Sequence, residues 1–304
     1  MSNNWRTVDL TRLSGRISFS KNTRFLDILD DLTGEIISIA PCEINVLFIG
    51  IKVQLEPAVM YHLANQGVIT VFTDWKGLPI SGVYPWVDPH GRVAARQRAQ
   101  SELSLPKKKN AWKNIVKAKV FGQANVIERV DLTVADKLRS MAQSVKSGDP
   151  ENIEAQAARL YWHNLFGDKS FRRLPGLGEP GKNALLDYGY TILRGQSMRA
   201  IVSAGLIPTL GIFHRGRGNQ FALADDLIEP FRPVIDAAVL RIGDECCIED
   251  KEVRRLLIEA TLEKFGTLDS VVQTAMTDFA QQYGRFIEGD IERLSVPIWG
   301  SHDQ

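Results

Sequence analysis

The N-terminal part of the chain combines short apolar runs with segments in which apolar and polar residues alternate. The runs at 46–49 and 68–72 are largely apolar and rich in β-branched residues, and turn residues bound them. Such runs are typical of buried β-strands, whereas alternation is typical of strands with one exposed face. A helix is predicted at 57–64, because Pro57 stands at its start and Gly67 just past its end. Four strands are predicted, at residues 16–20, 35–39, 46–49 and 68–72.

Proline and glycine are frequent over residues 77–92, and such a cluster of residues that interrupt helices and strands is typical of a hinge or a domain boundary. Beyond it the apolar residues follow helical spacing. Helices are predicted at residues 110–127, 134–145, 154–166, 182–203, 231–243, 251–265 and 268–288. The predicted fold class is therefore α+β with two domains: a small β-rich domain over residues 1–85, followed by a larger all-helical domain over residues 86–304.

The composition is that of a globular intracellular protein. With 304 residues, 44% of them hydrophobic, the chain can build one large core or two modest ones. Its three cysteines have no metal-binding spacing and predict free, buried thiols, as expected in a reducing cytoplasm. No window approaches the ~20 apolar residues of a membrane helix, and the first residues lack the apolar stretch of a signal peptide. We therefore expect a cytoplasmic protein without membrane contact.

The charge is unevenly distributed, although the whole chain carries only +1. Residues 86–125 hold nine Lys or Arg against two acids, a local excess of +7, and residues 241–304 carry a local −6. A nucleic-acid-binding protein needs a positive track rather than a positive total, so the basic segment is predicted to contact phosphates. For its lysines 107–109 alone, a solvated loop after Pro106 explains the sequence equally well. The nine residues are Arg92, Arg96, Arg98, Lys107, Lys108, Lys109, Lys113, Lys117 and Lys119.

Asp226 and Glu229 are the first candidates for chemistry. Residues at i and i+3 of a helical turn share one face, so both carboxylates can point to one place, with His214 a short distance upstream. Glu154 opens a run of helix-forming residues whose small side chains leave room around the acid. Hard divalent cations take oxygen ligands and tolerate one imidazole. These four residues therefore form a candidate metal-dependent catalytic site.

Each candidate also has an ordinary structural explanation. A histidine in a glycine-rich loop, as His214 is, more often has a surface or structural role. Asp226 could be a first-turn acid that the helix dipole favours, with Asp225 as the N-cap. Glu229 precedes a proline, which is an unusual place for a purely solvating acid, and Arg232 is expected to form an ion pair with it.

Three motifs that contain these residues stand in a fixed order along the chain. They are Glu-Ala-x-Ala-Ala-x-x-Tyr from Glu154, Gly-x-x-Pro-x-x-Gly-x-x-His ending at His214, and Asp-Leu-x-Glu-Pro-Phe-Arg-Pro from Asp226. Each motif alone is weak, since acid-rich helical turns are common. Together and in this order they resemble the Cas-one family, the metal-dependent integrase and nuclease subunits of CRISPR spacer acquisition. The length of the chain and the run at 185–190 are most similar to the form found in type II systems.

The resemblance implies that Glu154, His214 and Glu229 bind Mg²⁺ or Mn²⁺ and that Asp226 supports them in catalysis. It implies that the 3′-hydroxyl of an incoming DNA fragment attacks the repeat boundary of a CRISPR array, and that water as the nucleophile gives nuclease activity. It assigns dimerisation and partner binding to the β-rich domain. The implied partners are double-stranded DNA (prespacer and CRISPR repeat), a second copy of the chain, a small dimeric adaptation protein that bridges two dimers, and the type II effector nuclease.

Basic residues near the motifs are candidates for holding DNA phosphates. The candidates are Arg215, Arg217, Lys182, Arg172, Arg173, Lys107, Lys108 and Lys109. Tyr161 and Asn183, in matching segments, could orient a ligand or merely pack. Two other functions fit the sequence: an autonomous nuclease selective for branched DNA, and a DNA-binding scaffold without catalysis.

Overall fold

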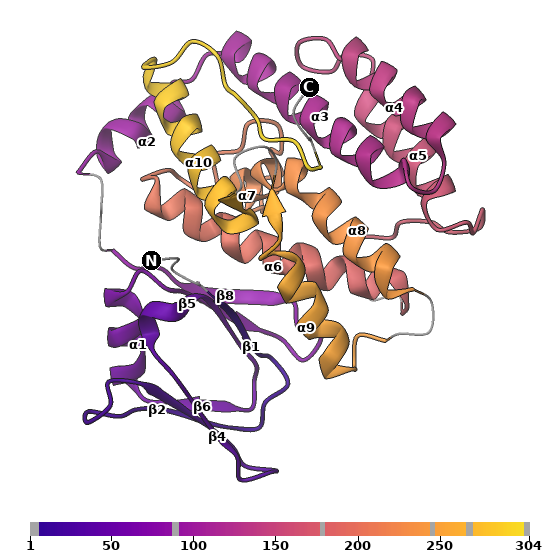
Figure 1. The fold of residues 1–304 in the computed structure, drawn as a ribbon. Helices are drawn as coiled ribbons and strands as arrows, with labels where there is room; N and C mark the ends of the chain where they lie inside the picture. Colours follow the sequence, from indigo (N-terminus) through magenta and orange to yellow (C-terminus); the bar gives the residue numbers. More distant parts are fainter. Residues whose placement is uncertain (1–5, 87–90, 177–179, 244–246, 266–269, 301–304) are drawn as a thin grey trace. The chain divides into compact units, whose positions relative to one another are not determined.

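A computed structural model describes residues 6–86, 91–176, 180–243, 247–265 and 270–300 of the chain. The chain forms two compact units, residues 1–91 and residues 92–304, which differ in secondary structure (Figure 1). The division between them falls inside the segment 77–92, in which the proline and glycine pattern predicts the boundary.

Between residues 6 and 86, the first unit consists of two four-stranded sheets and one α-helix. In one sheet, β1, β5 and β7 run parallel and β8 is antiparallel to β7, in the order β1-β5-β7-β8. The other sheet has the order β4-β3-β2-β6. The elements are β1 Arg6–Leu10, β2 Gly15–Phe19, β3 Leu26–Asp30, β4 Ile36–Ile39, the 3-10 turn η1 Pro41–Glu43, β5 Ile44–Ile49, β6 Val53–Leu55, α1 Pro57–Asn65, β7 Ile69–Thr73 and β8 Pro79–Val83.

Strand β5 supplies much of the core of this unit. All of its residues are buried, as its continuous apolar run predicts, and α1 adds Val59 and Leu63 to the same core. The four predicted strands and the predicted helix are all present, with ends that differ by at most two residues. Two of the additional strands lack a clear pattern: β6 has three residues, and β8 contains Pro79 and Gly82.

In its described residues, the second unit contains helices and one short strand pair. The strands β9 (Lys264–Phe265) and β10 (Ser270–Val271) pair antiparallel. The fold class is therefore confirmed as a β-rich part followed by a larger helical part, and this pair is the exception to an all-helical second domain. Within the described ranges, no helix is both long and apolar enough to cross a membrane. The helices are α2 Val93–Ser101, α3 Leu105–Ile127, α4 Leu132–Ser144, α5 Ile153–Leu165, α6 Lys182–Ser203, α7 Ala222–Leu227, the 3-10 turn η2 Glu229–Phe231, α8 Arg232–Ile242, α9 Lys251–Ala260 and α10 Val272–Glu288.

Helix α6 is the central helix of this unit. It is buried over much of its length and packs against α7, α8, α9 and α10 (Figure 1). Gly189 lies where α6 meets α8, and a Cβ atom there would come within 2.3 Å of Ile235 Cγ2. Because close-packed interiors do not tolerate such an approach, the two helices require glycine at this position.

Lysines 107–109 do not lie in a loop. Helix α3 begins at Leu105, so all three lysines are in its first turns, and Pro106 occupies the start of the helix, where its missing N–H costs nothing. The predicted loop after Pro106 is therefore wrong, whereas Lys107 and Lys109 are exposed, as the solvated alternative expects.

The cysteines also differ from expectation. Cys42 and Cys247 are free thiols, as predicted, but both are exposed rather than buried. Cys246 lies outside the described residues.

Replacing Gly189 by alanine tests the contact between α6 and α8. We expect Gly189→Ala to lower the free energy of unfolding by about 1–3 kcal/mol, because the added methyl group overpacks the interface although alanine favours a helix. Urea denaturation followed by circular dichroism measures this change. Combined with Ile235→Ala, the substitution should cost less than the sum of the two single changes. Additive effects would contradict the predicted clash.

Candidate metal site and nucleic-acid interface

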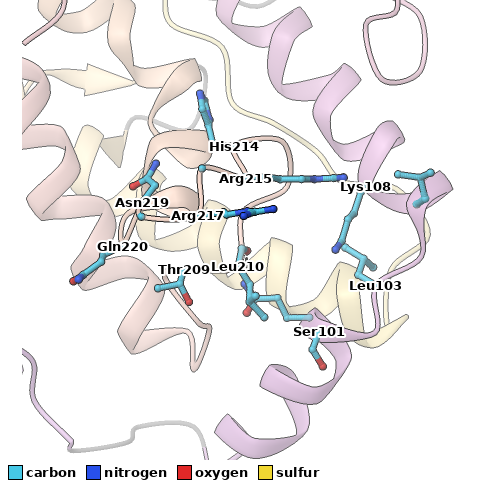
Figure 2. Close-up of a pocket in the computed structure, with 15 residues that line it drawn as sticks. Ser101, Leu103, Lys108, Thr209, Leu210, His214, Arg215, Arg217, Asn219 and Gln220 are labelled. Atoms are coloured by element: carbon cyan, nitrogen blue, oxygen red, sulfur yellow. Dashed lines mark hydrogen bonds between the residues drawn. The ribbon is translucent and has the colours of Figure 1, made fainter.

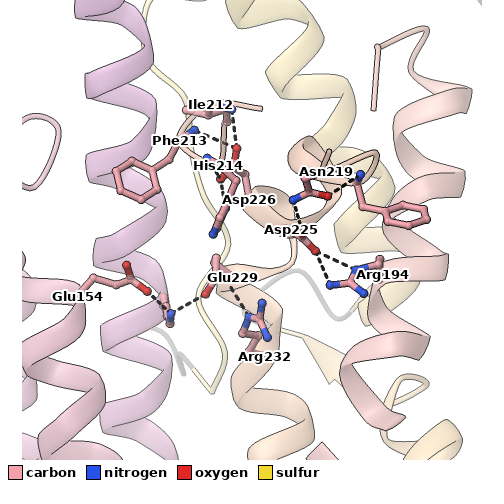
Figure 3. Close-up of polar contacts among 12 residues, drawn as sticks. Glu154, Arg194, Ile212, Phe213, His214, Asn219, Asp225, Asp226, Glu229 and Arg232 are labelled. Atoms are coloured by element: carbon pink, nitrogen blue, oxygen red, sulfur yellow. Dashed lines mark hydrogen bonds and ion pairs between the residues drawn. The ribbon is translucent and has the colours of Figure 1, made fainter. Parts of the chain in front are cut away.

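Asp226 holds the loop that carries His214. It lies in α7, is fully buried, and its Oδ2 accepts hydrogen bonds from the backbone N–H groups of Ile212 at 2.5 Å and Phe213 at 3.0 Å (Figure 3). Its Oδ1 accepts from the His214 backbone N–H at 3.2 Å and lies 2.7 Å from His214 Nδ1. Burial raises the pKa of the Asp226 carboxyl group, and these hydrogen bonds oppose the rise. One carboxylate therefore holds both the loop and the imidazole.

The contact with Asp226 also decides which ring nitrogen of His214 is free. Because an ionised carboxylate can only accept hydrogen bonds, Nδ1 of a neutral His214 carries the proton and Nε2 keeps its lone pair. The hydrogen bond to Asp226 raises the pKa of the imidazole, and the nearby charge of Glu229 adds to this effect. Carboxylate–histidine pairs of this kind orient imidazoles that bind metals.

The His214 loop can approach Asp226 closely only because residue 211 is glycine. A Cβ atom there would lie 2.4 Å from the carbonyl oxygen of His214 and 2.9 Å from Asp226 Oδ2. The second glycine of the Gly-x-x-Pro-x-x-Gly-x-x-His motif is therefore explained by close packing against the aspartate.

Asp225 was expected to be the N-cap of the helix that contains Asp226, and this expectation is wrong. The residue that precedes this helix is Phe221, and Asp225 lies inside it. Its Oδ1 accepts a hydrogen bond from Arg194 Nε at 2.8 Å, and its Oδ2 accepts one from Asn219 Nδ2 at 2.9 Å. Asp225 therefore joins α6 to the end of the His214 loop.

Glu154 and Glu229 converge on one cation, the ammonium group of Lys119. Glu154 lies in the first turn of α5, and Glu229 begins the turn η2 that follows α7. Lys119 Nζ is 2.5 Å from Glu154 Oε1 and 2.6 Å from Glu229 Oε2. Burial alone would lower the pKa of Lys119, but the charges of Glu229 and Glu154 raise it, so the ammonium stays protonated. Segments far apart in the sequence thus meet at this point.

Glu229 has a second cationic partner, Arg232. Its Oε1 accepts a hydrogen bond from Arg232 Nε at 2.9 Å, which confirms the predicted ion pair. Burial would raise the pKa of Glu229, but Arg232 and Lys119 lower it to about 2, so the buried carboxylate is ionised. Its Oε2 lies 2.6 Å from Lys119 Nζ, so each carboxylate oxygen of Glu229 faces a different cation.

Behind Arg232 lies a buried carboxyl group, that of Asp236. It accepts hydrogen bonds from the hydroxyl groups of Tyr190 at 2.5 Å and Tyr161 at 3.1 Å. Burial raises the pKa of Asp236 to about 6. The guanidinium group of Arg232 lies over the Tyr190 ring, 4.4 Å from its centroid, and links this network to Glu229. Tyr161 therefore belongs to the packing behind the candidate site.

The donor atoms at this site fit a hard divalent cation. Among the described residues, no three His, Cys, Asp or Glu side chains cluster closely enough to form a ready metal site. Two carboxylates nevertheless direct oxygens at one cationic position, which Lys119 Nζ occupies. Two carboxylates and one oriented imidazole are ligands that suit Mg²⁺ or Mn²⁺.

A cavity of about 790 Å³ lies beside His214 and has a basic lining (Figure 2). Arg215 and Arg217 extend from the loop toward helix α3, which contributes Lys108 to the same cavity. Both arginines are exposed. The helix dipole disfavours lysines in the first turns of α3, so an anion bound nearby would stabilise them. The cavity therefore suits a phosphate group.

Other members of the predicted basic track have internal partners. Arg96 is buried, lies 3.1 Å from Glu288 Oε2 and donates to the carbonyl oxygen of Ala204 at 2.7 Å. Arg92 is 2.9 Å from the other oxygen of Glu288, and Lys119 lies in the acidic site. The local excess of +7 therefore overstates the charge that is available to DNA. The prediction that the whole segment contacts phosphates is wrong for Arg96 and Lys119, which are buried in ion pairs.

The remaining basic candidates do not line the cavity beside His214. Arg173 is held by Asp187 at 2.5 Å and by Asn183 at 3.0 Å. Arg172 is exposed and donates to nearby backbone carbonyl groups, and Lys182 lies over the ring of Phe166 at 5.0 Å. Asn183 shapes the segment that contains the two arginines, since its side chain also donates to the carbonyl oxygen of Arg172. The contacts of Arg172, Arg173 and Lys182 with DNA therefore stay predictions.

The sequence predicts Lys119 only as one member of the basic track, and the structure places it between the two acids of the site. A signal was present, because Lys119 stands on the apolar side of its helix, four residues after Ile115 and seven after Trp112, and both of these are buried. A lysine on such a face requires an acidic partner.

The comparisons with known sequences establish the family. A family model described as "CRISPR associated protein Cas1" matches residues 15–266. The CRISPR-associated endonuclease Cas1 of Neisseria meningitidis serogroup C (strain 8013) is 34% identical over 243 residues, covering 79% of this chain and 77% of the relative. A Cas1 endonuclease of Pyrobaculum aerophilum is 28% identical over 68% of this chain and 74% of the relative. The chain therefore belongs to the Cas1 family of CRISPR-associated endonucleases, as the three motifs predict.

Solved structures share the fold at low sequence identity. A casposase bound to integration product has a TM-score of 0.76 and 19% identity, covering 98% of this chain and 96% of that one. A CAS1 protein from Thermotoga maritima has a TM-score of 0.74 and 16% identity, covering 98% and 100%. A Cas6-RT-Cas1–Cas2 complex has a TM-score of 0.71 and 16% identity, covering 100% of this chain and 37% of that one.

Replacing Asp226 by asparagine tests its hold on the loop. We expect Asp226→Asn to lower the free energy of unfolding by about 1–3 kcal/mol, because an amide NH₂ group cannot accept the hydrogen bonds now made to one carboxylate oxygen. Urea denaturation measures the loss, and ¹⁵N NMR of the imidazole reports whether Nδ1 keeps its proton. Asp136→Asn, at an exposed position, should change stability by less than about 0.5 kcal/mol. Unchanged stability and tautomer in Asp226→Asn would contradict this role.

Proposed function

We propose that this protein is a metal-dependent DNA integrase and endonuclease that inserts new spacer DNA into a CRISPR array. The 3′-hydroxyl of the incoming fragment attacks the phosphodiester at the repeat boundary, and water in its place gives hydrolysis. The observation that carries the proposal is the convergence of Glu154 and Glu229 on one cationic position, next to a histidine that Asp226 holds with Nε2 free.

Each residue of the site has a defined part in this reaction. Glu154, Glu229 and His214 would hold Mg²⁺ or Mn²⁺, which when bound neutralises phosphoryl charge and aligns nucleophile and leaving group. Asp226 keeps the imidazole in the tautomer that leaves Nε2 free. Arg232 keeps Glu229 ionised although it is buried.

The basic cavity is the proposed place of DNA phosphates. Lys108, Arg215 and Arg217 line it together with His214, so a phosphate held there would lie beside this proposed metal ligand. Such contacts fix the position of the backbone without reading the bases. Sequence preference would then come from elsewhere in the complex.

The comparisons support this function and suggest partners. One structure with the same fold is a casposase bound to an integration product, and another is a complex that contains Cas1 and Cas2. We infer double-stranded DNA, a second copy of this chain and a small dimeric protein of the Cas2 kind as partners, with the type II effector nuclease as a further candidate. The first unit, residues 1–91, is the proposed dimerisation and partner-binding part.

Two other functions make different predictions. An autonomous nuclease for branched DNA would cut but not join, and a DNA-binding scaffold would do neither. The ionised, converging carboxylates favour a catalytic site over a scaffold. A strand-transfer assay on a plasmid that carries a CRISPR repeat separates joining from cutting.

Removing the proposed ligands should stop the chemistry. We expect Glu154→Gln, His214→Asn and Glu229→Gln each to slow strand transfer and metal-dependent cleavage by about a hundredfold or more, because a neutral amide is a weaker metal ligand than the carboxylate or imidazole that it replaces. Rates are measured with purified protein in Mn²⁺, after circular dichroism has shown that the fold is retained. Glu151→Gln, at an exposed acid near Glu154, is the control and should react normally. A ligand variant with wild-type rates would exclude that residue from the site.

DNA binding should depend on the basic residues and not on the metal. We expect EDTA to stop the chemistry while DNA affinity changes little, because Lys and Arg contacts to phosphate carry the binding. Replacing Lys107, Lys108 and Lys109 by glutamine should reduce the slope of log K against log salt by up to about one unit per lost contact. Lys137→Gln, on α4, is the control. An unchanged slope in the triple variant would assign these lysines to solvent.

A further inference from the structure

Lys119 occupies the position on which the proposed metal ligands converge. It projects from the middle of α3 between the buried residues Ala118 and Val120, and only 8% of its own surface is exposed. Its Nζ atom contacts one oxygen of each carboxylate, Glu154 Oε1 at 2.5 Å and Glu229 Oε2 at 2.6 Å. A cation therefore lies between these two acids in the protein without metal.

The ammonium group and a divalent cation need the same oxygens. Mg²⁺ binds carboxylate oxygens at about 2.0–2.1 Å, so a metal shared by Glu154 and Glu229 would lie inside the space that Lys119 Nζ fills. Two positive charges this close in a buried site repel each other strongly. The metal and the ammonium cannot both stay there.

The two cations that hold Glu229 are not equivalent. Arg232 donates a hydrogen bond to Oε1 at 2.9 Å and is also held over the Tyr190 ring, away from Glu154. Lys119 contacts Oε2 at 2.6 Å and is shared with Glu154 Oε1, so it stands between the two acids and Arg232 does not. Glu154, the other partner, has a quarter of its side chain exposed, which opens the pair to ions from solvent. Lys119 is therefore the partner that a metal can replace.

We propose that Lys119 is a built-in cation that holds the metal position in the metal-free protein and is displaced when a divalent metal binds. This inference rests on the proposed function, since it takes Glu154 and Glu229 as metal ligands. In the absence of metal the ammonium offsets the repulsion between the two acids and keeps them in place. Metal binding is then an exchange of cations, so Lys119 lowers the affinity of the site for metal.

Metal affinity in a lysine variant tests the exchange. Lys119→Met keeps the length of the side chain and removes its charge, so we expect the Kd for Mn²⁺, measured by isothermal titration calorimetry without DNA, to fall at least tenfold. Lys117→Met removes the same charge from the same helix two residues away and should leave the Kd within a factor of about two. An unchanged or weaker affinity in folded Lys119→Met overturns the proposal.

The two acids could prevent Lys119→Met from folding, because they would then lack their shared cation. Lys119→Gln provides a neutral side chain that still donates hydrogen bonds, and the same fall in Kd is expected for it. The wild-type protein gives an independent readout through ¹⁵N-labelled lysine, in which the NMR signal of the buried Lys119 ammonium should leave its position as Mg²⁺ is added. A signal that stays unchanged at saturating Mg²⁺ contradicts displacement.

Glu229→Gln separates failure of this inference from failure of the proposed function. If Mn²⁺ binding disappears in Glu229→Gln but is the same in Lys119→Met as in the wild type, the metal site stands and the exchange is wrong. If the wild-type protein binds no Mn²⁺, both are wrong. Tighter binding in Lys119→Met that is lost again on adding Glu229→Gln supports both.

Discussion

The candidate site depends on an ionised carboxylate that is kept inside the protein. Glu229 has only 5% of its side chain exposed, yet Arg232 and Lys119 lower its pKa to about 2. Removing a carboxylate from water is costly unless cations compensate it, so these partners are what make the buried acid possible. Their own positions depend in turn on the packing of α3 and α8 around the turn η2, where a Cβ at Gly122 would lie 2.8 Å from Pro233.

The histidine side of the site is organised by a different kind of constraint. Asp226 accepts hydrogen bonds from three consecutive backbone N–H groups and from the imidazole, so the loop and the ring move together. A buried acceptor with this many donors is expensive to disturb, which favours one loop conformation. The site thus combines charge compensation around Glu229 with hydrogen-bond positioning of His214, and both fix side chains that the proposed metal would need.

Much of the fold follows from local patterns, and the exceptions have local causes. Helix α6 agrees with its predicted range, Lys182–Ser203, because its apolar residues and its flanking glycines define it clearly. Helix α7 was missed because six residues are too few to show a period. Helix α3 starts five residues before its predicted range, since Pro106 reads as a break in sequence but is favourable in a first turn. Strand β1 pairs with β5 although polar residues interrupt it.

For the site, the sequence alone determined which residues are candidates for catalysis. It indicates a set of carboxylates and one imidazole, formed by Glu154, His214, Asp226 and Glu229, and it indicates the family. Tertiary structure decided their parts. Asp226 contacts His214 in the loop, Lys119 of the predicted basic track forms ion pairs with the acids of the site, and Arg96 forms an ion pair with Glu288. The physical reason is that ion pairs and burial depend on segments that are distant in the chain, and local periodicity does not record which of them meet.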